Sequence, residues 1–192
     1  MIRELDRENR IYFAYGEDMH PDIIGERVAA PYATGIARLD GFRLDFYGHT
    51  PRWDGGAETL VRDPREKVWG VLYKFDFDDA ELLDGIWDTR LDGTGSHYHL
   101  PVEVALPDGT TAVALTFVLS ERGRYRPPSA EYVNLVAEAG RLHGLDRHYC
   151  ERLQSQPCGP ANYPVPREAK YGASECGSCG DMREELRAAA GA

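Results

Sequence analysis

Positive charge is scarce in this sequence. Lys and Arg together number 22 against 32 Asp and Glu, so the formal net charge is −10. A general nucleic-acid-binding protein needs a basic face for the phosphates, and an anionic membrane surface would also repel so acidic a chain. The charge balance therefore argues against both classes of partner, and a small-molecule ligand remains open.

Long apolar runs are also missing. No stretch of about 20 apolar residues is present, which is the length that a membrane-spanning helix requires. The first ten residues are charged and have no apolar core of the kind found in signal peptides. From these two features we expect a cytoplasmic protein with no membrane span. A hydrophobic content of 42% over 192 residues fits one medium-sized domain with its own core.

Cysteine is absent from the first 149 residues. All four cysteines lie in the last quarter of the chain: Cys150, Cys158, Cys176 and Cys179. The last two form a C-x-x-C pair with glycines, a spacing at which both sulfurs can bind one metal ion. The first two could complete a four-sulfur zinc site, and His143 or His148 could replace one of them. The sequence leaves structural zinc, disulfides and free thiols open, and favours the last two taken together.

Strand patterns dominate the first two thirds of the chain. Residues 11–15 form a short apolar run, and three longer segments each read as two strands around a turn: 34–49 around "LDG", 57–75 around "DPRE" and 98–119 around "PDG". We therefore expect about seven mostly antiparallel strands in a sheet that can curl into a barrel. His97 and His99 would share one face of such a strand, and we do not interpret this pair as a metal site.

Helical patterns are fewer. The expected helices cover residues 20–28, 76–88, 127–144 and 146–155. Asp76 or Asp78 can cap the second helix, Ser129 can cap the third, and Gly144 can end it. From residue 156 onward the sequence is rich in Pro, Gly, Ser and Cys and has no periodicity. We expect a domain over residues 1–155 and an irregular, Cys-rich C-terminal arm over residues 156–192.

Several short motifs resemble, in the same order, those of the gamma-glutamylcyclotransferase-like family. They are "FAYGEDM", "LDGFRLDF", "WDGGAETL", "KVWGVLYKF", "LLDGIWD", "PPSAEYVNLV" and "HGLDRHYCERL". The resemblance covers roughly residues 11–154. It implies an α+β fold, a small mixed and mostly antiparallel β-barrel with a few peripheral helices.

The resemblance also implies a reaction. In that family the free α-amine of a gamma-glutamyl group attacks its own side-chain amide, which gives 5-oxoproline and a released amine. The reaction needs a near-attack geometry, a base, and donors for the substrate carboxylate and the oxyanion. It needs no cofactor. Carried onto this sequence, the substrate-binding residues are Tyr15, Gly16, Glu17, Asp18, Met19 and Tyr132.

This sequence departs from the family pattern at acidic positions. Trp87 stands where the family has its catalytic glutamate, and Asp88 is the next residue. Glu17 and Asp18 replace a neutral Ser and Asn in the glycine turn, and Glu58 replaces a small residue. One interpretation is that the base has moved to Glu58 or Glu17 and that the ligand is cationic or carries an amine. The other is that these acids face water and that activity is lost.

Two hypotheses follow. The first is an enzyme that cyclises a gamma-glutamyl amide, with Glu58 and Asp88 as candidate catalytic residues. The second is a non-catalytic module for binding a small molecule or assembling proteins, whose C-terminal arm is stabilised by a metal or by disulfides and contacts a protein partner. The position of Glu58 and Tyr132 around one cavity would favour the first hypothesis.

Overall fold

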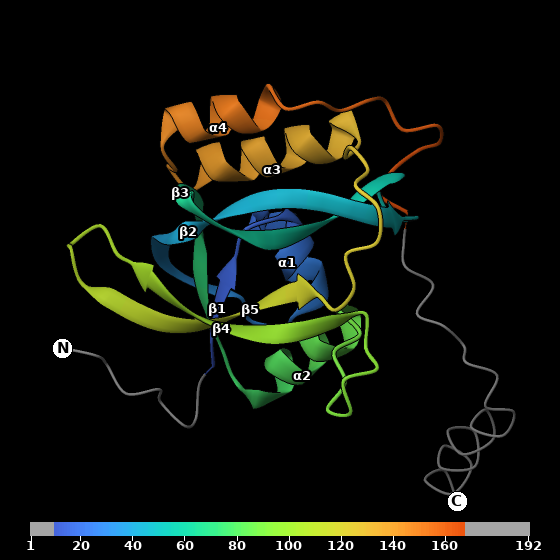
Figure 1. Cartoon of the computed structure of the whole chain (residues 1–192). Coiled ribbons are helices and arrows are strands. Elements are labelled where there is room, and N and C mark those ends of the chain that lie inside the picture. Colours follow the sequence, from blue (N-terminus) through green and yellow to red (C-terminus); the bar gives the residue numbers. More distant parts are fainter. Residues whose placement is uncertain (1–9, 168–192) are drawn as a thin grey trace, which may run out of the picture.

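A computed structural model describes residues 10–167 and shows a closed five-stranded barrel. The strands are β1 (Arg10–Ala14), β2 (Tyr32–Thr50), β3 (Gly55–Phe75), β4 (His97–Ala105) and β5 (Thr111–Leu119). Their order around the barrel is β1-β3-β2-β4-β5 (Figure 1). All pairs are antiparallel except β1 with β5, which meet at Tyr12 and Leu115. The predicted small, mostly antiparallel α+β barrel is confirmed.

The prediction of about seven strands was wrong, because two of the three expected hairpins do not exist. The segments around "LDG" and "DPRE" are two continuous strands, β2 and β3, which pair with each other. Their register shifts between the pairs Asp40–Lys67 and Phe42–Arg62, where Gly41 has a φ of +80°. A glycine at positive φ is compatible with a β-bulge as well as with a turn. Here the parts of β2 before and after Gly41 both pair with β3. The third expected hairpin, β4 with β5, is confirmed.

The helices lie where the sequence predicts them. They are α1 (Pro21–Arg27), α2 (Phe77–Ile86), α3 (Ala130–Leu142) and α4 (Arg147–Gln154), and a short 3₁₀ turn, η1 (Glu17–Met19), follows β1. Asp76 caps α2 by accepting from the amide of Asp79, and Ser129 caps α3 by accepting from the amide of Tyr132. Figure 1 shows α3 and α4 side by side against β2 and β3, with α2 on the other side of the barrel. No helix within residues 10–167 has the length and apolar character needed to cross a membrane.

The core fills the barrel and the space beneath α3. Its fully buried side chains include Phe13, Phe46, Phe75, Val71, Val104 and Val136. This packing fixes the end of β1, so that η1 lies at one end of the barrel. The turn between β2 and β3 and the C-terminal end of α2 both reach that end, and they supply the side chains described below.

Residues 156–167 are irregular, as expected for the start of the arm, and they lie on the turn between β2 and β3. The amide of Arg167 donates to the carbonyl oxygen of Arg52 at 2.9 Å. The amide of Asn162 donates to Asp54 Oδ2 at 2.7 Å, and the Tyr163 hydroxyl donates to the carbonyl oxygen of Pro51 at 2.8 Å. The rest of the arm, with the C-x-x-C pair, lies outside the described residues.

Candidate functional site

A cavity of about 240 Å³ lies at the end of the barrel where β1 passes into η1. Its polar and aromatic lining residues are Glu17, His49, Thr50, Trp53, Glu58, Trp87, Ser96, His97 and Tyr132. It therefore brings together three of the residues predicted from sequence: Glu17, Glu58 and Tyr132. Of the glycine turn, Glu17 lines the cavity together with Tyr132.

Glu58 lies against the glycine turn. A Cβ atom placed on Gly16 would collide with the Glu58 carboxyl group, so the side chain fits only because that position is glycine. Glu58 is 8% exposed, and its Oε2 atom has no hydrogen-bond partner among the described residues. A buried carboxyl oxygen without a partner is costly in a structural role and is typical of a site that awaits a ligand.

The environment of Glu58 favours its protonated form. Burial raises the pKa of Glu58 well above its usual value, and the nearby charges of Glu17 and Asp18 raise this pKa further. Arg27 and the backbone N–H of Glu17 act in the opposite direction without cancelling the effect. Glu58 is thus a stronger base than a carboxylate in water, because it holds a proton to higher pH.

We expect Glu58→Gln to change how stability depends on pH. The pKa of Glu58 is higher in the folded protein than its usual 4.5, so the folded state binds more protons between these two values. The stability contributed by this group is complete below about pH 4.5 and is lost as the pH rises through the folded pKa. Between pH 4.5 and the folded pKa of Glu58, the free energy of unfolding of the wild type should fall by on the order of 1 kcal/mol per pH unit relative to that of the variant. Urea unfolding of both proteins across pH measures this, and parallel curves would contradict a raised pKa.

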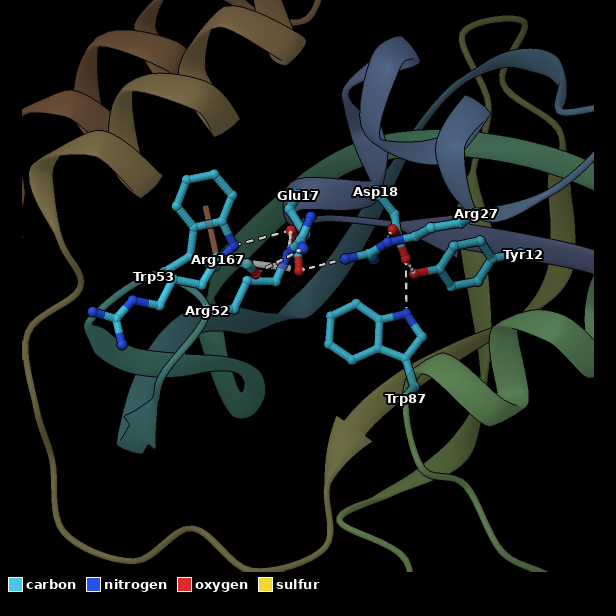
Figure 2. Close-up of polar contacts among 8 residues, drawn as sticks. All are labelled: Tyr12, Glu17, Asp18, Arg27, Arg52, Trp53, Trp87 and Arg167. Atoms are coloured by element: carbon cyan, nitrogen blue, oxygen red, sulfur yellow. Dashed lines mark hydrogen bonds and ion pairs between the residues drawn. The ribbon is translucent and has the colours of Figure 1, made fainter. Parts of the chain in front are cut away.

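Glu17 is held by two arginines and an indole. Arg27 Nη2 lies 2.7 Å from Glu17 Oε1, and Arg52 Nε lies 2.9 Å from Glu17 Oε2. Trp53 Nε1 also donates to Oε2 at 2.9 Å (Figure 2). Burial alone would raise the pKa of Glu17, but the charges of Arg27 and Arg52 outweigh it and lower that pKa. Glu17 is therefore a carboxylate whose charge is already paired, and it is not a good base.

Asp18 is held equally tightly. Its carboxylate pairs with Arg27 and accepts from the Tyr12 hydroxyl and from Trp87 Nε1, each at 2.8 Å. The guanidinium of Arg27 also lies 5.2 Å from the centre of the Trp87 ring (Figure 2). Trp87, at the position of the family's base, therefore donates a hydrogen bond that fixes Asp18. The sequence did not reveal this network, because Arg27 and Arg52 lie in no recognisable motif.

The structure places the other predicted site residues outside the cavity. The Tyr15 hydroxyl donates to the carbonyl oxygen of Phe117 at 2.7 Å, and Met19 is buried in the core. Helix α2 ends at Ile86, but Asp88 then turns away from the cavity at a φ of +45°. Its carboxylate accepts from the Ser96 amide and from Arg90 Nε. Of the two candidate catalytic residues, Glu58 reaches the cavity and Asp88 does not.

One cavity residue was missed by the sequence interpretation. His97 Nδ1 lies 2.9 Å from the carbonyl oxygen of Trp87, and the two rings meet edge to face at 4.9 Å. His97 Nε2 is buried without a partner among the described residues. Its supposed companion, His99, instead lies 2.6 Å from Asp84. No signal in the sequence separates these two histidines, because the difference depends on a carbonyl group ten residues away.

The described cysteines are free thiols. Cys150 is buried beside Gly140, and Cys158 is exposed. His143 Nε2 lies 2.9 Å from the carbonyl oxygen of Met19, and His148 lies on the surface beside Glu151. Within residues 10–167 no cluster of three His, Cys, Asp or Glu side chains is arranged to bind a metal. Cys176 and Cys179 lie outside the described residues, so the structural zinc, the disulfides and a protein partner for the arm all remain predictions.

Comparisons with known proteins agree with the motifs and the fold. The model of the AIG2-like family matches residues 67–153. Gamma-glutamylcyclotransferase of Bos taurus is 29% identical over 160 residues, which cover 80% of this chain and 82% of that protein. The Homo sapiens enzyme is 29% identical over 154 residues, covering 78% and 80%. A solved structure of a gamma-glutamyl cyclotransferase superimposes with a TM-score of 0.77 at 26% identity, covering 84% of this chain and 95% of that one. Sequence and structure together confirm that this chain resembles the gamma-glutamylcyclotransferase-like family.

Proposed function

We propose that this protein cyclises a gamma-glutamyl amide to 5-oxoproline and releases an amine, with Glu58 as the base. The observation that carries the proposal is the buried, unpartnered Oε2 atom of Glu58 in the cavity, against Gly16. The named gamma-glutamylcyclotransferases that this chain resembles support the same reaction class. No other carboxyl group with a raised pKa lines the cavity among the described residues.

The chemistry follows from two of the unpartnered polar groups in the cavity, those of Glu58 and Tyr132. Glu58 takes a proton from the substrate α-ammonium, because a protonated amine is not a nucleophile. The amine nitrogen then attacks the gamma carbonyl carbon, and the carbonyl oxygen becomes an oxyanion. The Tyr132 hydroxyl, buried and without a partner among the described residues, donates a hydrogen bond to that oxyanion. As the amide C–N bond breaks, Glu58 returns its proton to the leaving amine. Glu58 then takes the second proton of the ring nitrogen, which leaves the neutral five-membered lactam, and this proton departs with the released amine as an ammonium ion.

The aromatic packing around Tyr132 suits this role. Its ring meets Phe46 edge to face at 5.8 Å and Trp53 at 5.5 Å. A ring held from two sides presents its hydroxyl in one direction, so little reorganisation is needed during the reaction. Because the attack is intramolecular, most of the acceleration is expected from holding the amine close to its own carbonyl group.

The proposal is tested by measuring 5-oxoproline release from a broad panel of gamma-glutamyl amides. We expect release by the wild type and a loss of about 10²–10³-fold in Tyr132→Phe, since the oxyanion loses its donor. Tyr149→Phe is the matched control, because the Tyr149 hydroxyl is equally buried and unpartnered but lies outside this cavity. Equal losses in the two variants would show that Tyr132 matters for packing alone.

A second function is favoured by one observation. Trp87 occupies the family's base position and is engaged with Asp18, which suits a site that binds without reacting. If the wild type releases no 5-oxoproline from any amide of the panel but a panel member quenches the fluorescence of Trp53 and Trp87, the non-catalytic binding function replaces the enzyme.

A further inference from the structure

The cavity has no cationic side chain to offer a ligand. None of the described residues that line it is Lys or Arg, and the neighbouring Arg27 and Arg52 are engaged with Glu17 and Asp18. The lining residue His49 is paired with Asp54 at 3.1 Å. Every gamma-glutamyl amide already brings one carboxylate, that of the glutamyl half. A second carboxylate on the released half would face Glu17 and find no counter-charge.

His97 presents an acceptor to the same cavity. A carbonyl oxygen can only accept, so the 2.9 Å contact with the Trp87 carbonyl places the imidazole proton on Nδ1. Burial lowers the pKa of His97, which keeps the ring neutral. Nε2 therefore carries a lone pair, is buried, and has no partner among the described residues. A ligand that supplies an N–H or O–H group to this atom would satisfy it.

Apart from the hydroxyl groups of Thr50 and Ser96, the remaining lining is largely aromatic and apolar. Trp53, Trp87 and Tyr132 offer aromatic surfaces, and Leu119 and Pro51 complete the wall. Aromatic side chains of this kind stack on planar groups of a ligand with little loss of conformational freedom. A cavity with aromatic walls, an unpartnered neutral acceptor at His97 and no Lys or Arg among its described lining residues distinguishes among amines by charge as well as by shape.

We propose that the amine released from this cavity is aromatic, has no carboxylate, and donates a hydrogen bond to His97 Nε2. This inference rests on the proposed function and specifies its substrate class. His97 is then a residue that determines specificity, and Glu58 and Tyr132 act on the bond that breaks. Gamma-glutamyl conjugates of amino acids are disfavoured, because their second carboxylate would be buried without a partner.

Three matched probes test the inference: gamma-glutamyltyramine, gamma-glutamylphenethylamine and gamma-glutamyltyrosine. The first two differ by one hydroxyl group, and the first and third differ by one carboxylate. We expect kcat/KM for the tyramine conjugate to exceed that for the tyrosine conjugate by about 10²-fold and that for the phenethylamine conjugate by about tenfold. Equal or faster turnover of the tyrosine conjugate overturns the inference and leaves the proposed function intact.

His97→Phe keeps a flat ring beside Trp87 and removes the acceptor. The ratio between the tyramine and phenethylamine conjugates should fall to about one, and a general loss of activity would not mimic this change because the readout is a ratio. His97→Gln, whose amide oxygen can accept, should retain part of the ratio. An unchanged ratio in both variants overturns the role of His97.

Binding of the same three conjugates, followed by quenching of tryptophan fluorescence, separates the two proposals. The same order of affinity without any 5-oxoproline would remove the proposed reaction and uphold the ligand class. Turnover of all three conjugates at similar rates would uphold the proposed reaction and overturn the proposed ligand class.

Discussion

Replacing Glu58 with Gln is expected to lower 5-oxoproline release by about 10²–10⁴-fold, the range that a general base contributes. Gln has nearly the same shape, so the side chain still fits against Gly16, but it cannot take a proton from the substrate ammonium. Because the wild-type group is buried with a raised pKa, the variant should fold normally and be at least as stable at neutral pH. Initial rates at saturating substrate, together with urea unfolding of both proteins, separate the chemical loss from a folding loss.

Asp88→Asn is the matched control for this substitution. The Asp88 side chain is 43% exposed, accepts from Ser96 and Arg90, and does not line the cavity. Its variant should keep its rate within about twofold, as is usual for surface changes away from a site. If Asp88→Asn removed activity and Glu58→Gln did not, the base would lie one residue beyond the family's position, and Glu58 would lose its role.

Replacing Arg27 with Met is expected to cost about 3–5 kcal/mol of unfolding free energy, the range for breaking a buried ion pair by removing one partner. The side chains of Arg27, Glu17 and Asp18 are 8%, 6% and 1% exposed. Without the guanidinium, Asp18 keeps its donors Tyr12 and Trp87 but no counter-charge. Methionine preserves most of the volume, so the loss reports on charge. Urea unfolding at neutral pH measures it.

Two further variants define the Arg27 effect. Arg38→Met removes a surface guanidinium that bonds to both oxygens of Asp40, and it should cost no more than about 1 kcal/mol. Asp18→Asn added to Arg27→Met should recover part of the loss, because one buried charge is removed. A loss in Arg27→Met no larger than that in Arg38→Met would mean that solvent reaches the acids and screens them.

Much of the fold was predictable because its signals are local. A few neighbouring residues determine the helix caps at Asp76 and Ser129 and the turn between β4 and β5. The barrel was predicted from the order of the family motifs. The long strands β2 and β3 were missed for a physical reason. A glycine such as Gly41 permits a reversal or a bulge equally well, and which one forms depends on pairing partners distant in sequence.

The site was predictable in part. Glu17, Glu58 and Tyr132 were singled out by comparison with the family motifs, and all three line one cavity. The pairing of Glu17 with Arg27 and Arg52 was not predictable, since charges ten and 35 positions away carry no periodicity. Neutralised in this way, Glu17 and Asp18 do not attract a cation as the sequence suggested. Helix α2 ends before Asp88, but the Asp88 side chain does not line the cavity.

The order in which the barrel can be assembled follows from its connectivity. Strands β2 and β3 are joined by a short turn and can pair early, whereas β1 must find β3 and β5, the latter about 100 residues away, to close the ring. The Gly16 turn follows β1 directly, so it can reach Glu58 of β3 only once β1 has docked on the paired strands. The arrival of Glu17 beside Trp53 should therefore coincide with the slowest step of folding. Indole fluorescence in a refolding experiment would record completion of the cavity and of the whole domain as a single event.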